Sequence, residues 1–183
     1  TDVAFLLLTF FILTTQFKKP DVEQIKPPSS ISEKLLPDAS LMTVNATPDG
    51  KFYFQPVENA SERLQLLDNM GQKYGLSFTN EEKASFQKVQ AIGVPMSQLK
   101  GYLDMSSDEQ KNFKSPTGIP MDSTRKELID WVQQSLAVNP DYKLAIKGDI
   151  NTKYPRIKNL FEGLRDIEFL KFWLITSQEG KPQ

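Results

Sequence analysis

The chain has 183 residues with 22 Lys and Arg against 23 Asp and Glu, and it contains neither Cys nor His. Disulfides, Cys/His zinc sites, Cys nucleophiles and any catalytic triad that uses His are therefore excluded. A net charge of -1 without a long basic run argues against nucleic acid as a partner. The length accommodates one short anchor and one ordinary domain.

Residues 1–17 form the most apolar part of the chain. Between Val3 and Leu13 the only polar residue is Thr9, and no charge occurs. Fifteen helical residues span roughly 23 Å, whereas the hydrocarbon core of a bilayer is about 30 Å thick. We therefore expect a transmembrane helix that is truncated at its N-terminus, with the missing residues upstream of Thr1. That extension would place Asp2 inside the hydrocarbon.

Two other interpretations of this segment stay open. A cleaved signal peptide needs a basic start and a small-residue cleavage site, and the residues around Thr14 and Thr15 match such a site poorly. A buried core helix would need a partner helix, but a proline-rich stretch follows. The interpretation of Asp2 is also open, because a carboxylate in a membrane helix is either functional or merely the interfacial end of the helix.

Residues 18–40 are expected to form an extended linker. They contain four prolines, which lack an N–H and restrict φ, and several serines lie between them. Lys18 and Lys19 follow the apolar segment directly, and by the positive-inside tendency these two residues would favour the cytoplasm. This indication conflicts with the orientation adopted below.

Residues 41–183 are expected to form an α+β domain. A strand over 41–45, the turn Thr47–Gly50 and a returning strand over 51–54 predict a hairpin. A helix follows, begun by Asn59 or Ser61 and ended at Gly75.

The stretch 76–121 predicts a helical insertion of short helices separated by prolines. Thr79 with Glu82, and Ser106 with Glu109, have the spacing of capping boxes. The acidic pairs Glu81–Glu82 and Asp108–Glu109 are assigned to helix starts, where the helix dipole favours them, in preference to acid–base chemistry.

The last third predicts a helix, a strand, a helix and a strand. The first helix is expected to open at Asp122 or Ser123, and the second at Thr152. The strands are expected over 142–146 and 169–176, and the second of them is expected to be buried. A turn at Asp149 is expected between the first strand and the second helix. Strand, helix and strand at this spacing form a parallel βαβ unit. Trp131 and Trp173 are both expected in the core.

No constellation in the domain indicates catalysis. The phosphate-binding Gly-x-x-x-x-Gly-Lys loop is absent, and no nucleophile is spaced with a base. The sequence therefore predicts no enzyme, no cofactor and no metal site.

Several segments together resemble the ExbD/TolR family of biopolymer transport proteins. Asp2–Phe11 looks like the family's single membrane segment, which has Asp-Val followed by an apolar run. Leu35-Leu36-Pro37 resembles its linker signature, and 142–149 and 152–176 resemble its last strands and helix. The insertion 76–121 departs from short members and is similar to insertions in Bacteroidetes members.

The resemblance implies a proton-driven motor subunit of the inner membrane, with one crossing and a periplasmic C-terminal domain. Its partners would be a second copy (a homodimer), an ExbB/TolQ-type multi-span pentamer, a TonB-like protein and membrane lipid. Asp2 matches the family's proton-carrying carboxylate, and Thr14 and Thr15 are polar residues that could line the same path. TolR-like envelope maintenance, gliding, and an anchored periplasmic binding module remain alternatives.

Overall fold

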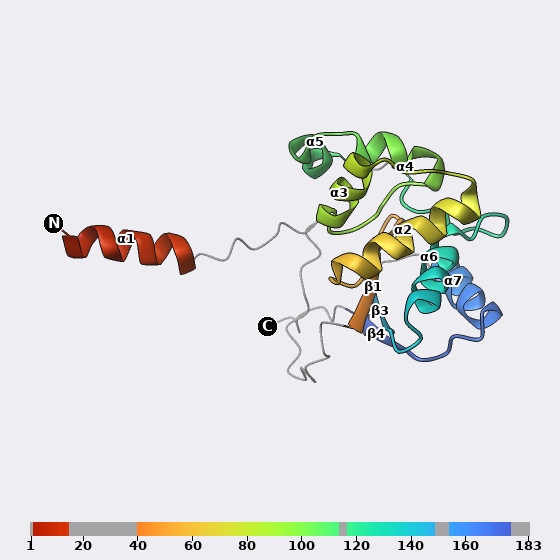
Figure 1. The fold of residues 1–183 in the computed structure, drawn as a ribbon. Helices are drawn as coiled ribbons and strands as arrows, with labels where there is room; N and C mark the ends of the chain where they lie inside the picture. The colour runs from red at the N-terminus through yellow and green to blue at the C-terminus, as the bar shows by residue number, and fades with distance from the viewer. Residues whose placement is uncertain (1, 15–39, 114–116, 149–153, 177–183) are drawn as a thin grey trace, which may run out of the picture.

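The computed structural model describes residues 2–14, 40–113, 117–148 and 154–176 (Figure 1). Helices and strands of a mixed α+β fold follow α1, and from residue 41 onwards they confirm the predicted fold class. The elements in chain order are α1 Asp2–Thr14, β1 Leu41–Ala46, β2 Phe52–Gln55, α2 Ala60–Tyr74, α3 Asn80–Lys88, α4 Met96–Leu103, α5 Ser107–Asn112, α6 Glu127–Val138, β3 Lys143–Gly148, α7 Tyr154–Asp166 and β4 Phe172–Thr176.

Four strands form one sheet in the order β2-β1-β3-β4. β1 and β2 pair antiparallel with Val44 opposite Phe54, which confirms the hairpin. β1 and β3 are parallel, and so are β3 and β4, with Ile146 opposite both Val44 and Leu174. The predicted βαβ unit is therefore β3-α7-β4.

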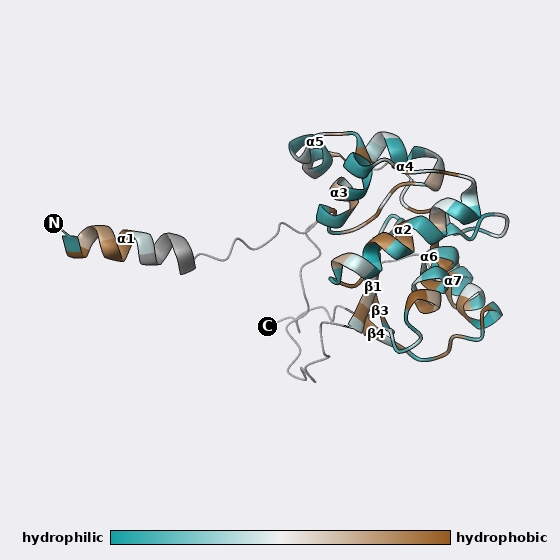
Figure 2. Ribbon diagram, in the orientation of Figure 1, coloured by the Kyte–Doolittle hydropathy of each residue, from teal (hydrophilic) through white to brown (hydrophobic). Residues whose placement is uncertain are grey.

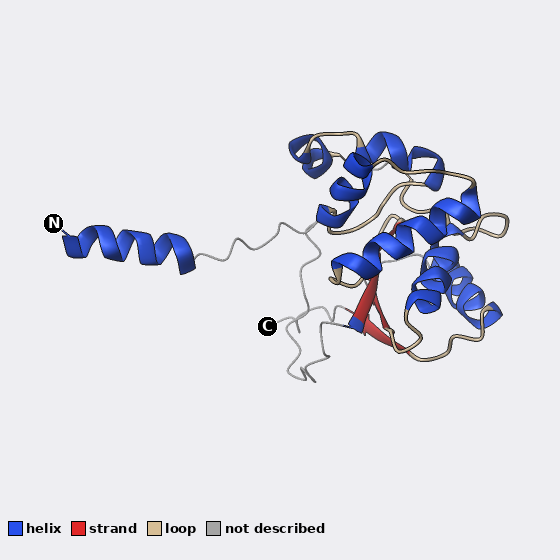
Figure 3. Ribbon diagram, viewed as in Figure 1, coloured by secondary structure: helices blue, strands red, loops and turns tan. Residues whose placement is uncertain are grey.

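One face of the sheet carries the core. Helices lie beside the sheet (Figure 3), and residues of α2, α6 and α7 belong to the same hydrophobic core as residues of the strands. Trp131 of α6 is completely buried, and its ring stacks on Phe54 of β2 at 6.1 Å and on Phe86 of α3 at 6.0 Å. The strand residues that point into this core are at most 1 % exposed: Met42, Val44, Ala46, Phe52, Phe54, Leu144 and Ile146.

The predicted limits of α2 are confirmed by its caps. The Asn59 side chain accepts hydrogen bonds from the N–H groups of Ser61 and Glu62, and Gly75 ends the helix with φ +69°. Asparagine satisfies otherwise unpaired N–H groups at a helix start, and glycine adopts the left-handed conformation without a Cβ clash.

Both predicted capping boxes are present in the stretch 76–121. Thr79 and Glu82 bond reciprocally at the start of α3, and Ser106 and Glu109 do so at the start of α5. The helical character expected for this stretch is therefore confirmed, as is the place of the acidic residues in first turns.

The stretch 76–121 also completes the sheet at its β2 edge. Phe54 and Ile92 exchange two backbone hydrogen bonds, with N···O distances of 2.8 and 2.7 Å. Further along, the N–H of Ile119 donates to the carbonyl of Phe52 at 2.9 Å. Met96 and Leu99 join the same hydrophobic core as the sheet. This stretch is thus an integral part of the domain's packing.

The predicted start of the helix at Asp122 or Ser123 is wrong, because α6 begins at Glu127. The Asp122 carboxylate instead accepts hydrogen bonds from the N–H groups of Thr124 and Arg125, at 2.9 and 2.8 Å. Aspartate competes in this way with helix formation by closing a turn of its own.

The prediction of a buried last strand is also wrong. β4 is shorter than 169–176 and lies at the edge of the sheet, where Leu174 is 52 % exposed and Trp173 is 38 % exposed. Trp173 is therefore not a core residue, whereas Trp131 is. Composition suggested burial, but a terminal strand has a neighbour on only one side.

The apolar N-terminal segment forms α1, which ends at Thr14 in the described part of the chain. No described helix is both long and apolar enough to cross a bilayer. The predicted linker up to residue 39, the predicted helix start at Thr152 and the predicted turn at Asp149 lie outside the described residues.

Candidate functional site

Helix α1 carries a single charged residue, Asp2, in its first turn (Figure 2). Apolar residues follow it, interrupted before Thr14 only by Thr9, whose hydroxyl donates to the carbonyl of Phe5. That local bond satisfies the hydroxyl within the helix itself.

The apolar side chains of residues 3–8 in α1 are not covered by other described residues. Val3, Phe5 and Leu6 are 69, 68 and 62 % exposed, and Leu7 and Leu8 are exposed to a similar degree. These side chains surround the helix, so its apolar surface is not a single stripe. A helix that is apolar on all sides is typically covered on all sides, by lipid or by other helices.

Asp2 and Thr9 share one face of α1. Thr9 comes seven positions after Asp2, so at 3.6 residues per turn the two lie within about 20° of each other round the axis and about 10 Å apart along it. Both are exposed. The face that carries the only carboxylate of α1 therefore also carries the only hydroxyl among its first twelve residues.

The structure does not bring Thr14 close to Asp2. Thr14 is the last residue of α1, about 18 Å along the axis from Asp2 and about 120° round it. Thr15 lies outside the described residues. Thr9 was missed as a candidate, although its seven-residue spacing from Asp2 was visible in the sequence.

Two poorly exposed carboxylates of the domain have structural partners on neighbouring helices. The Asp130 carboxylate accepts from the Tyr74 hydroxyl and from the Lys73 ammonium, both at 2.6 Å, and so ties α6 to α2. Burial and this carboxylate raise the pKa of Tyr74. Glu82, only 3 % exposed, pairs with Lys100 at 3.1 Å and so ties α3 to α4. These pairs connect helices and converge on no common cavity.

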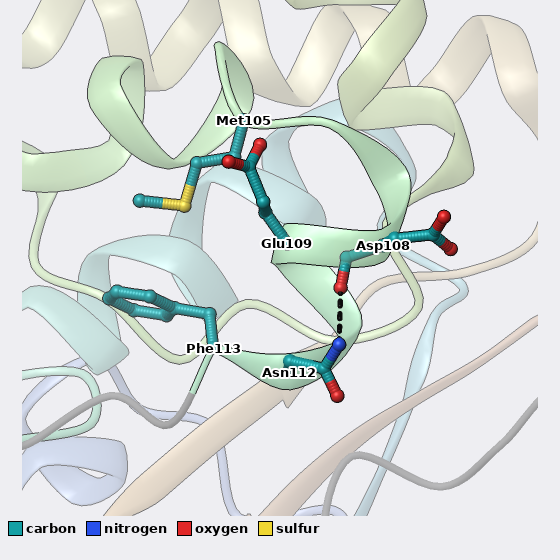
Figure 4. Close-up of a pocket in the computed structure, with 5 residues that line it drawn as sticks. All are labelled: Met105, Asp108, Glu109, Asn112 and Phe113. Atoms are coloured by element: carbon teal, nitrogen blue, oxygen red, sulfur yellow. Dashed lines mark hydrogen bonds between the residues drawn. The ribbon is translucent and has the colours of Figure 1, made fainter.

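The described residues contain no group of three or more acidic side chains arranged to hold a metal ion. An open pocket of about 450 Å³ lies at α5, lined by Met105, Asp108, Glu109, Asn112 and Phe113 (Figure 4). The Glu109 side chain is occupied in the capping box, and hydrogen bonding to Ser106 lowers its pKa. Within this pocket the Glu109 carboxylate therefore has a structural role at the start of α5.

Comparison with protein families gives one match over nearly the whole chain. The family described as "ExbD: Biopolymer transport protein ExbD/TolR" matches residues 1–179. No curated protein and no solved structure matches the chain. The match includes α1 with Asp2, all four strands of the sheet and the stretch 76–121.

Proposed function

The chain belongs to the ExbD/TolR family of biopolymer transport proteins, and from that premise we propose that it carries protons for an energy-transducing complex, with Asp2 as the proton carrier. The family assigns a general role in energised biopolymer transport. The carrier role of Asp2 is our proposal, and it is supported by the position of this carboxylate in an uncovered apolar helix.

The proposal makes α1 part of a membrane segment of the inner membrane. Its apolar side chains need a non-aqueous environment, which lipid and partner helices supply. A charged residue in such a segment costs about 2.5–3.5 kcal/mol on insertion scales and is retained where it faces a partner or a water-filled path. An ExbB/TolQ-type pentamer around two copies of α1 would offer that path.

The proton would act by changing the charge of Asp2. Protonated, the carboxyl group can face apolar surface; ionised, it needs a polar or hydrated neighbour. A surrounding pore that stabilises the two forms in different positions would convert proton passage into movement of α1. Moving one charge through the membrane potential releases about 2.3 kcal/mol per 100 mV, which is sufficient to bias such a two-state movement.

In this proposal the domain of residues 41–183 lies in the periplasm and passes the movement to a TonB-like protein. Family members are transport proteins and not enzymes, and we assign the same character to this chain. The orientation follows the family, although Lys18 and Lys19 alone would favour the opposite side.

The decisive experiment is uptake of an outer-membrane transporter substrate by cells that carry Asp2→Asn at normal expression. We expect uptake to be lost, because the amide is nearly isosteric but does not ionise. Asp2→Glu is the matched control, since it keeps the ionisable group and should retain part of the activity. Co-purification of the pentamer with both variants verifies assembly. Normal uptake by assembled Asp2→Asn would rule out the carrier role.

The family covers outputs of both the ExbD and the TolR kind. Deleting the TonB-like gene should reproduce the Asp2→Asn phenotype if the output is transport. If uptake is normal but envelope integrity or gliding is defective, the chain would instead be a subunit of a TolR-like envelope complex or of a gliding motor.

A further inference from the structure

The two edges of the sheet are treated differently by the fold. The β2 edge is closed, because Phe54 pairs with Ile92 and the carbonyl of Phe52 accepts from Ile119. The β4 edge is the other end of the sheet, and no strand or bridge within the described residues pairs with it. A strand added from another chain would therefore extend the sheet at β4.

β4 lacks the features that protect sheet edges from pairing. Its five residues, Phe172–Thr176, include neither a charge nor a proline. Natural edge strands usually carry lysine, proline or a bulge, and long apolar edges without them pair with other chains. Leu174 and Trp173 keep large exposed fractions here. The edge thus combines backbone groups that no described strand pairs with and apolar side chains that a further strand would cover.

The outer face of the sheet beside this edge is positively charged. Lys143 and Lys147 are the only charged residues in the four strands, and both are exposed on the face opposite the core. Strand register places Trp173 next to Ala145 on this same face, and the Lys143 ammonium lies 5.5 Å from the centre of the Trp173 ring. Exposed Lys171 directly precedes β4. None of the three lysines has an ion-pair partner in the described part of the chain.

From this juxtaposition we propose that the β4 edge binds an extended acidic polypeptide segment of a partner protein, which adds a strand to the sheet and sets its carboxylates against Lys143 and Lys147. Main-chain hydrogen bonds supply affinity in this mode of recognition, and alternate side chains supply specificity. A strand next to β4 would direct every second side chain to the outer face, beside Trp173 and towards the lysines.

The observations favour this occupant over two others. A second copy paired through its own β4 would bring two sets of lysines onto one continuous face with no acidic strand residue between them. An anionic lipid surface would match the lysines but would leave the backbone groups of β4 without partners. An extended acidic segment would pair both with the lysine side chains and with the backbone groups of β4. The inference stands whether or not Asp2 carries a proton.

The two tryptophans provide the readout. Trp131 is completely buried and Trp173 is 38 % exposed, so a blue shift of the emission on binding reports on Trp173. The full-length chain in detergent is titrated with a peptide of alternating Val and Glu. Two control peptides are used: one of alternating Val and Lys, and one of Val and Glu N-methylated at alternate residues, which cannot pair along one edge.

We expect the Val/Glu peptide to bind in a salt-dependent manner, and the two control peptides to bind at least several-fold more weakly. Lys143→Glu and Lys147→Glu should each weaken binding roughly three- to tenfold, the scale of reversing one exposed ion pair. Lys88→Glu is the matched control, because Lys88 is an exposed lysine on α3, away from the sheet. It should leave binding unchanged.

Three results would overturn the proposal. The first is equal binding of all three peptides. The second is a shift of Trp173 emission with vesicles of anionic phospholipid but not with the Val/Glu peptide. The third is complete disulfide cross-linking of Leu174→Cys between two copies, which is readily tested because the chain has no cysteine of its own; it would assign the edge to a second copy.

Discussion

The backbone N–H of Met96 donates a hydrogen bond of 2.8 Å to Oε2 of Glu127. Met96 begins α4, whose N-cap position is Pro95 and has no side-chain cap of its own. Glu127 begins α6, so a carboxylate from one helix caps the start of another that lies 31 residues earlier in the chain. This contact connects the stretch 76–121 to α6, in addition to the backbone bonds that join the stretch to β2.

Replacing Glu127 by Ala should lower the free energy of unfolding by about 1–2 kcal/mol, the usual cost of losing a helix cap. The measurement is urea unfolding of the full-length chain followed by tryptophan emission. Glu162→Ala is the control, since this exposed carboxylate makes only a 3.6 Å pair with Lys158. Equal losses of unfolding free energy in the two variants would show that the hydrogen bond from Met96 to Glu127 does not stabilise the fold.

Glu127 should also make stability depend on pH. Burial, the largest cause, raises its pKa above the ordinary carboxyl value, while the bond from Met96 opposes this shift. A carboxyl group with a raised pKa in the folded state binds protons more readily there, so its contribution to stability falls as pH rises through the interval between the unfolded and folded pKa values. Glu127→Gln does not titrate. The free energy of unfolding of Glu127→Gln, relative to that of the wild type, should therefore be higher at pH 7 than at pH 3. Parallel urea titrations at the two pH values measure this difference. A change of the opposite sign would contradict the raised pKa of Glu127.

Gly118 and Gly75 form a matched pair for testing how the β2 edge is closed. Both have positive φ, +66° and +69°, but a Cβ at Gly118 would lie 2.9 Å from the backbone N and O of Phe52, whereas a Cβ at Gly75 would meet nothing within 4 Å. Gly75→Ala should cost about 1–2 kcal/mol for the left-handed backbone alone.

Gly118→Ala should cost about 1–3 kcal/mol more, because β2 must shift to accommodate the methyl group. Thermal unfolding of the two variants gives the comparison. If the costs are the same, the approach of Gly118 to Phe52 is looser than the structure shows.

The buried Arg63 guanidinium should be important for packing α2 against α3. It donates to the carbonyls of Phe86, at 3.2 Å, and of Val89, and these groups end α3. Arg63→Met keeps the aliphatic volume but removes the donor to the Val89 carbonyl, whereas the Phe86 carbonyl still accepts from the N–H of Val89. We expect a loss of about 1–3 kcal/mol. Arg125→Met is the control, since the Arg125 side chain is 64 % exposed. The urea midpoints of the two variants are compared. A smaller loss of stability for Arg63→Met than for Arg125→Met would contradict the packing role of Arg63.

The shared face of Asp2 and Thr9 predicts unequal roles for the threonines of α1. Thr9→Val removes the hydroxyl that lies on the Asp2 face, and it should reduce transporter-dependent uptake several-fold. Thr14→Val makes the same chemical change at a position about 120° round the helix, where we expect a smaller effect. Uptake is measured at equal expression, and a larger loss from Thr14→Val would assign the proton path to the other face.

The sequence by itself determined the local structure of this protein. Apolar residues around Asp2 predicted a helix, and α1 is one. Asn59, Gly75 and the two capping boxes marked helix ends correctly because caps depend on residues within a few positions of one another. The turn at Gly50 and the alternation of β3 likewise depend on neighbouring residues only, so the hairpin and the βαβ unit could be predicted.

Only the tertiary structure decided which elements are covered and which are exposed. Phe172–Thr176 has the composition of a buried strand, but its place at the end of the sheet order exposes Trp173. Glu127 was not recognised as a cap, because its partner Met96 is distant in the chain. The closure of the β2 edge by Ile92 and Ile119 is equally non-local. Burial and long-range hydrogen bonds depend on how elements pack, and that arrangement is set by the complete core and not by any one segment.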